Sequence, residues 1–106
     1  MGIIECMEGL NLDDEIMQER VVEARLAIAQ TFIADGKAEE GERLYKQALT
    51  HAEAMAGKDS PLAGSVLLDL IDLYEDQGRH DEAKVLWVRV RKILLIHLPQ
   101  LLKQHE

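Results

Sequence analysis

Histidine, cysteine and acidic side chains are the groups in this 106-residue sequence that could bind a metal or catalyse a reaction. No two histidines have the i, i+4 spacing of a helical zinc site, and the single cysteine, Cys6, has no neighbouring thiol. We therefore expect no metal and no cofactor. Structural or surface roles are predicted for all four histidines, which are His51, His80, His97 and His105.

Carboxylates are numerous, but abundance alone does not indicate catalysis. Acid–base chemistry needs a carboxyl group whose pKa is shifted by an apolar pocket, and the sequence shows no such pocket. A glycine-rich phosphate-binding loop is also missing from the sequence. An enzyme is therefore the least favoured class of protein. A deep pocket lined by His51 or His80 together with paired carboxylates would make the enzyme hypothesis worth reconsidering.

The charge balance limits the choice of partner. Acidic residues outnumber basic ones by 20 to 12, which gives a formal net charge of −8. Binding to nucleic acid or to an anionic membrane needs the opposite balance. The sequence has no apolar run of transmembrane length and no secretory signal, and one cysteine forms no internal disulfide. These features predict a cytoplasmic chain whose partner is another protein.

Glycine and proline divide the chain into four predicted helices. Alanine and leucine dominate the sequence and runs of β-branched residues are scarce, which favours an all-α fold because unbranched side chains lose little rotamer freedom in a helix. Gly36 and Gly78 are expected to end the first and third helices, and Ser60 and Pro61 to begin the third. Pro99 is expected to disturb the last helix. The predicted helices span residues 13–35, 38–56, 61–77 and 80–97.

The sequence repeats with a period of 42 residues. Gly36 and Gly78 are 42 residues apart, and the same offset joins Phe32 to Tyr74 and matches several other large residues. Such a register indicates a duplicated helical hairpin. The further pairs are Leu26 with Leu68, Ile28 with Leu70, Leu44 with Leu86, and Tyr45 with Trp87.

This pattern resembles the tetratricopeptide repeat. In the second repeat the residues are Leu67, Leu70, Tyr74, Gly78, Ala83 and Trp87; in the first they are Ile28, Phe32, Gly36, Gly41, Tyr45 and Ala48. The long period is similar to that of kinesin light chains. Three positions depart from the pattern: Gly41 stands where alanine is usual, and Val90 and Ile71 where small residues are usual. The four aromatic residues Phe32, Tyr45, Tyr74 and Trp87 are predicted to be core.

The resemblance implies two tandem antiparallel hairpins that bind a partner on the concave face formed by their first helices. We expect three regions: an N-terminal segment, 1–12, which is either flexible or packed on the groove; a domain, 13–98, with repeats at about 16–56 and 61–97; and a tail, 99–106. The residues predicted to bind the partner are Leu26, Gln30, Ile33, Leu68, Asp69, Asp72 and Asp76. These side chains predict an apolar and basic partner, although a solvated acidic face is an equally good interpretation.

The last helix carries more apolar residues than one hairpin buries, and two repeats fall below the three or so of a stable stack. A homodimer is therefore predicted, with a different protein partner as the rival. The residues predicted to self-associate are Ile93, Leu94, Ile96, Leu98, Leu101 and Leu102. The leading hypothesis is an adaptor, small chaperone or assembly factor. The alternative is a purely structural subunit that binds only itself.

Overall fold

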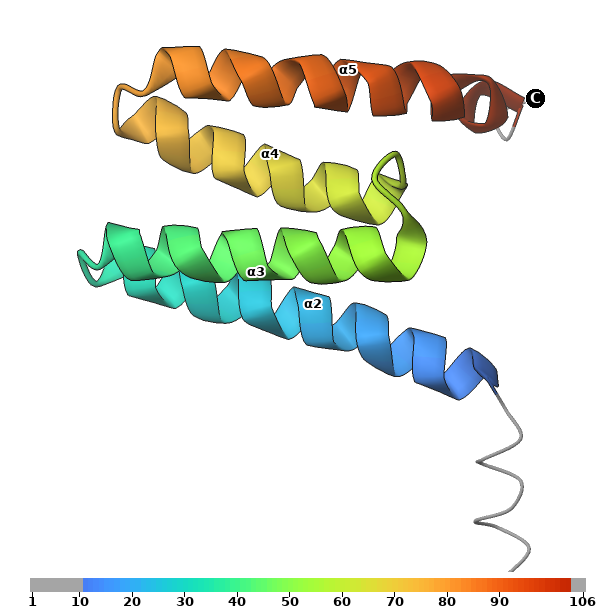
Figure 1. The fold of residues 1–106 in the computed structure, drawn as a ribbon, viewed down its shortest axis with the longest axis horizontal. Coiled ribbons are helices and arrows are strands. Elements are labelled where there is room, and N and C mark those ends of the chain that lie inside the picture. Colours follow the sequence, from blue (N-terminus) through green and yellow to red (C-terminus); the bar gives the residue numbers. More distant parts are fainter. Residues whose placement is uncertain (1–10, 104–106) are drawn as a thin grey trace, which may run out of the picture.

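The computed structural model describes the backbone of residues 11–103 and the side chains of residues 17–99. Four helices follow one another in this part of the chain, and no strand occurs in it (Figure 1). They are α2 (Asn11–Ala34), α3 (Ala38–Ala56), α4 (Pro61–Asp76) and α5 (His80–Lys103). The prediction of an all-α fold of two helical hairpins is therefore confirmed. The proposed packing of residues 1–12 on the groove lies outside the described side chains.

The same turn closes both hairpins, as the repeat predicts. Gly36 and Gly78 have φ values of 85° and 75°, a region that costs glycine little because it has no Cβ. The amide of Lys37 donates to the carbonyl of Phe32 at 2.8 Å, and that of Arg79 donates to the carbonyl of Tyr74 at 2.8 Å. These bonds satisfy carbonyl groups left over at each helix end.

The third helix begins where the sequence predicts. The Ser60 side chain accepts a hydrogen bond from the amide of Ala63 at 3.1 Å, and Pro61 occupies the first turn. The Pro61 nitrogen needs no partner because it carries no hydrogen. Sequence and structure therefore agree on the loop that joins the two repeats.

The last helix is longer than predicted. We expected α5 to end near His97, but it continues past Pro99 to Lys103. Proline removes the hydrogen bond that its amide would give to the carbonyl of Leu95, and Leu95 lies on the exposed side of the helix. Because water can reach that side, the lost bond does not end the helix.

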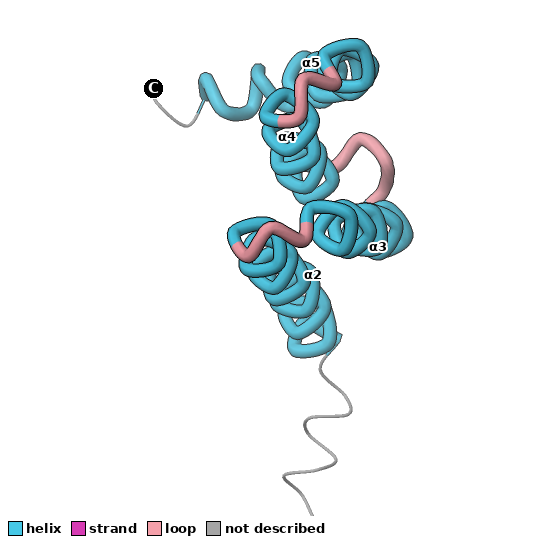
Figure 2. Tube along the Cα trace, turned by 90° about the vertical axis from the view of Figure 1, so that its left-hand side faces the viewer, coloured by secondary structure: helices cyan, strands magenta, loops and turns pink. Residues whose placement is uncertain are grey.

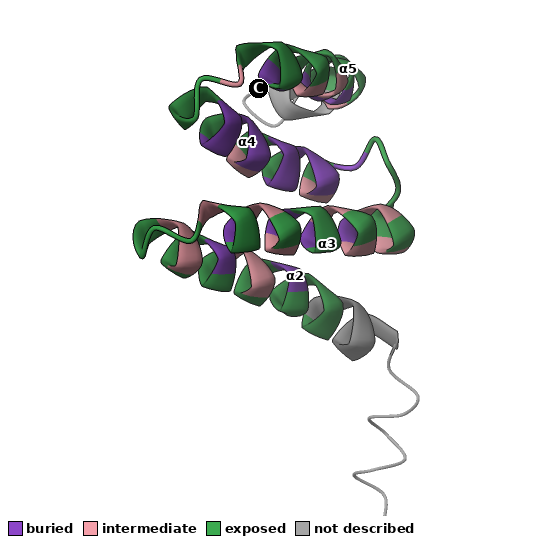
Figure 3. Cartoon of the chain, turned by 60° about the vertical axis from the view of Figure 1, so that its left-hand side comes forward, coloured by how far each residue is buried: buried purple, intermediate pink, exposed green. Residues whose placement is uncertain are grey.

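The core forms between the hairpins as well as within them. Figure 2 shows α2 and α4, the first helix of each hairpin, on one side of the stack and α3 on the other. Small side chains, among them Ala29, Ala48 and Ala52, are fully buried and allow close helix approach. The face of α4 predicted to be core is buried along its whole length (Figure 3), and its residues are Leu67, Leu70, Ile71 and Tyr74.

One of the aromatic core predictions is wrong. Tyr45 and Tyr74 are buried and Phe32 is half-buried, but Trp87 is 43% exposed. Tyr45 is buried because the second hairpin covers α3. Within the described residues no helix covers the corresponding side of α5, so the equivalent aromatic stays at the surface.

Candidate functional site

A small groove lies between α2, α3 and α4. Its volume is about 120 Å³, well below the roughly 300–1,000 Å³ of pockets for small-molecule ligands. It is large enough for one side chain of a partner rather than for a separate ligand. The lining residues are Gln30, Ile33, Tyr45, Asp69, Asp72, Leu73 and Asp76, and we call this cavity the α2–α4 groove.

Five of the seven residues predicted to bind a partner line this groove: Gln30, Ile33, Asp69, Asp72 and Asp76. The structure does not bring the other two there. Leu26 is half-buried and packs against the core. Leu68 is exposed, but it does not line the groove.

Sequence reasoning missed two residues of the groove. Tyr45 was assigned to the core only, yet it is buried and also forms part of the groove wall. Leu73 was not singled out, although it follows Asp69 by four residues and so lies on the same side of α4. Together with Ile33 they give the acidic groove an apolar wall.

The electrostatics of the groove favour a cation. Burial raises the pKa of the Asp69 carboxyl above its ordinary value, and the neighbouring Asp72 raises it further. Burial and Asp69 raise the pKa of the Tyr45 hydroxyl in the same way. Both shifts have the same physical meaning: negative charge in this groove is poorly solvated and is repelled by its acidic neighbours, and only a hydrogen bond from Gln30 opposes the shift at Tyr45.

We expect Asp69→Asn to stabilise the fold slightly. Folding raises the pKa of Asp69, so the folded state loses stability as pH rises from the pKa of the unfolded chain through the higher pKa of the folded state. Removing the charge should therefore increase the free energy of unfolding at pH 7 by about 0.5 kcal/mol, allowing for solvent screening. The gain should vanish below about pH 3.9, where an aspartate of the unfolded chain is protonated.

Urea denaturation at pH 7 and pH 3 measures this difference. Asp81→Asn is the control, because Asp81 is exposed in the first turn of α5, where a carboxylate favours the helix dipole. Equal effects of the two substitutions would show that the groove does not destabilise the charged form of Asp69.

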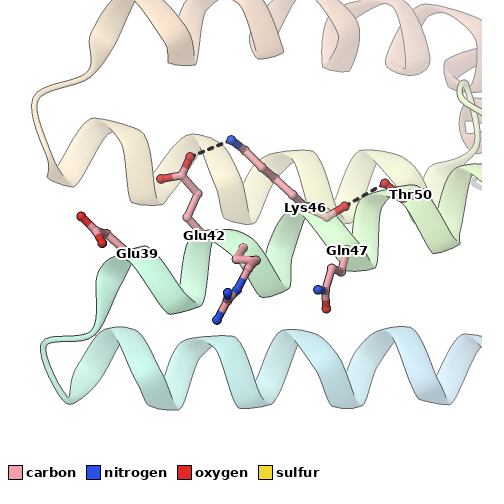
Figure 4. A pocket seen from close by; sticks show the side chains of 6 residues that line it. Glu39, Glu42, Lys46, Gln47 and Thr50 are labelled. Carbon is pink, nitrogen blue, oxygen red and sulfur yellow. Dashed lines mark hydrogen bonds and ion pairs between the residues drawn. The ribbon is translucent and has the colours of Figure 1, made fainter.

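A second depression, of about 410 Å³, lies along α3. Figure 4 shows its side chains, which all come from this single helix: Glu39, Glu42, Arg43, Lys46, Gln47 and Thr50. One of them, Glu42, already forms an ion pair with Lys46 at 2.9 Å and with Arg79 at 2.7 Å. This depression is therefore the surface of one helix, and its Glu42 is already paired with basic side chains of the chain itself. The α2–α4 groove is the better candidate site.

The residues considered for metal binding do not come together. Within the described residues, no group of three histidine, cysteine or acidic side chains could hold a metal ion. His97 contacts the carbonyl of Asp59 at 2.9 Å, and His80 is exposed. Cys6 and His105 lie outside the described residues.

The residues predicted to self-associate divide into two groups. Ile93 is buried in the core, where its side chain lies next to Gly64, so it is not part of a surface. Leu94, Ile96 and Leu98 are exposed, while the side chains of Leu101 and Leu102 are outside the described part. The homodimer stays a prediction, which a monomeric mass by light scattering at micromolar concentration would contradict.

Two stacked helical hairpins with a groove between their first helices define a helical-repeat protein. A family model described as tetratricopeptide repeat matches residues 20–86, so the chain belongs to the tetratricopeptide repeat family. Repeats of this family generally mediate protein–protein interactions. No curated protein and no solved structure matches the chain significantly. Among the described residues, no helix is long and apolar enough to cross a membrane.

Proposed function

We propose that this chain is a cytoplasmic protein-binding module, of the adaptor, small chaperone or assembly factor kind, which holds a partner segment in the α2–α4 groove. The observation that carries the proposal is the composition of that groove. Three carboxylates, Asp69, Asp72 and Asp76, lie beside apolar side chains contributed by three different helices. This combination fits a segment with both apolar and basic residues.

A lysine or arginine of the partner matches the groove in size and in chemistry. Its alkyl stem would contact Ile33 and Leu73, while its charged end would approach the carboxylates. The raised pKa of Asp69 supports this proposal, because a bound cation would compensate a charge that burial now destabilises. Neighbouring apolar residues of the partner would lie along the exposed parts of α2 and α4.

Charge reversal of the groove tests this proposal. The variant Asp69→Lys, Asp72→Lys, Asp76→Lys should bind a fluorescein-labelled peptide with alternating leucine and lysine residues at least about tenfold more weakly than the unmodified chain does. Fluorescence anisotropy at about 0.15 M salt measures both affinities, because weak long-range attraction is screened there.

A matched control separates the groove from the overall charge. Glu19→Lys, Glu39→Lys, Asp81→Lys makes the same change in net charge at exposed positions outside the groove. It should retain at least half of the peptide affinity. A loss as large as that of the groove variant would indicate non-specific attraction to an acidic chain and would overturn the proposed site.

A further inference from the structure

Helix α5 carries a stripe of exposed residues at the three- and four-residue spacing of one helical face. Three of them are apolar, and Leu94 is 50% exposed. Two cations are interleaved with them. We call this set the α5 stripe; its residues are Lys84, Trp87, Arg91, Leu94 and Leu98. Large apolar side chains aligned on a surface indicate an interaction site.

The repeat explains what this stripe is. The residues 42 positions before Trp87, Arg91 and Leu94 are Tyr45, Leu49 and Ala52 on α3. Tyr45 is 4% exposed and belongs to the cluster that includes Leu70 and Leu73 of α4, while Ala52 is fully buried with Val66 of α4. In repeat one this stripe is therefore the surface on which the next helix packs. In repeat two the same surface is present and uncovered within the described residues.

The charge on the α5 stripe differs from that of its counterpart. Glu42, which joins repeat one to Arg79 of repeat two, corresponds to Lys84, and Leu49 corresponds to Arg91. Between Ala83 and Leu98, α5 contains four basic residues and no acidic one, although the chain as a whole has a net charge of −8. Two of the four already have acidic neighbours, because Arg89 contacts Glu53 at 2.6 Å and Lys92 lies 3.6 Å from Asp59.

A second copy of the chain fits this surface poorly. If α2 of another copy were stacked as α4 is stacked on repeat one, the residue equivalent to Arg79 would be Lys37, which would meet Lys84. The residue equivalent to Tyr74 would be Phe32, which has no hydroxyl group. A two-fold pairing of α5 with itself would bring the same cations together. Like charges in such contacts oppose association.

We propose that the α5 stripe is a second docking surface, separate from the α2–α4 groove, and that it binds an acidic amphipathic helix of another protein. The apolar side of that helix would cover Trp87, Leu94 and Leu98. Its carboxylates would pair with Lys84 and Arg91, at the position where Glu42 and Arg79 join the two repeats. This inference does not depend on what the groove binds.

Trp87 supplies a direct readout, because it is the single tryptophan of the sequence and lies in the stripe. The probe is an 18-residue helical peptide with leucines at three- and four-residue spacing and glutamates beside them. Its counterpart has lysine in place of every glutamate. The glutamate peptide should shift Trp87 emission to shorter wavelength, and the lysine peptide should cause a much smaller shift, because we expect it to bind the groove, which Trp87 does not line. An equal or larger shift of Trp87 emission with the lysine peptide would overturn the proposal.

Charge exchange provides the matched test. Lys84→Glu with Arg91→Glu should reverse the preference between the two peptides, whereas Lys37→Glu with Lys58→Glu, which makes the same change in charge elsewhere, should preserve it. An unchanged preference in the stripe variant would contradict the proposal. So would a shift of Trp87 emission that grows with protein concentration without peptide, because it would identify a second copy as the occupant.

Discussion

Replacing Arg79 with alanine is expected to destabilise the fold several times more than the loss of an exposed ion pair would, because it leaves a largely buried carboxylate without its main partner. Arg79 contacts both carboxylate oxygens of Glu42, at 2.7 and 3.3 Å, and its guanidinium lies 4.2 Å from the centre of the Tyr74 ring. The Glu42 side chain is 15% exposed, and that of Arg79 is 32% exposed. The pair joins α3 of repeat one to the turn of repeat two.

The pH dependence of stability should identify the same contact. Arg79, with further hydrogen bonds from Lys46 and Tyr74, lowers the pKa of Glu42 from 4.5 to about 2 against the opposing effect of burial. Since the folded-state pKa is depressed, the stabilisation is fully present above about pH 4.5. It is lost as pH falls toward 2. Arg79→Ala should therefore weaken the dependence of stability on pH within this interval.

Urea denaturation between pH 2 and pH 7 measures both effects, because urea carries no charge and does not screen the ion pair. Arg43→Ala is the control, because Arg43 pairs with Glu40 on an exposed side of the same helix. Such a pair contributes about 0.5 kcal/mol or less. If the two variants lose equal stability, the contact between the repeats does not stabilise the stack. A double-mutant cycle of Arg79→Ala with Glu42→Gln gives the coupling energy directly.

The second large effect is expected from Gly41→Ala, a change toward the residue that is usual at this position of the repeat. A Cβ on Gly41 would overlap Cγ1 of Ile33 and lie 3.0 Å from the carbonyl oxygen of Ala29. Alanine gains about 1 kcal/mol of helix propensity over glycine, but overpacking a buried contact costs about 1–3 kcal/mol. We expect a net loss of about 1 kcal/mol and a displaced Ile33, which also lines the groove.

Gly64→Ala is the matched control for this prediction. A Cβ on Gly64 would meet Ile93 at 3.5 Å, which is an ordinary contact, so the helix propensity gain of about 0.5–1 kcal/mol should appear as higher stability. Thermal unfolding compares the two variants. Adding Ile33→Ala should remove the penalty of Gly41→Ala, and a penalty that persists in the double variant would show that Ile33 is not the obstacle.

The three acidic residues on α4 show how much of the candidate site could be predicted from the sequence. Asp69, Asp72 and Asp76 share one side of a helix whatever the helix packs on, so their spacing alone places them together. Gln30 and Ile33 were assigned to the same face from the repeat. The sequence could not show that Leu26 and Leu68 lie outside the groove. Small rotations of α2 and α4 about their axes determine which of the neighbouring side chains line it.

The helices and their duplication were determined by the sequence itself. Gly36, Gly78, Ser60 and Pro61 act on the backbone within one turn of helix, and such local effects need no knowledge of the partner helices. The end of α5 was misjudged because the cost of Pro99 depends on whether water reaches the carbonyl of Leu95. That exposure is set by packing and not by the local sequence.

Only the tertiary structure decided how the two repeats meet. The Glu42–Arg79 contact joins residues 37 positions apart, and no local sequence pattern predicts it. The exposure of Trp87, the burial of Ile93 and the tight fit at Gly41 likewise depend on which helix covers which. Hydrophobic periodicity assigns a side chain to one face of its helix, but the stacking of the hairpins determines whether that face is core, groove or surface.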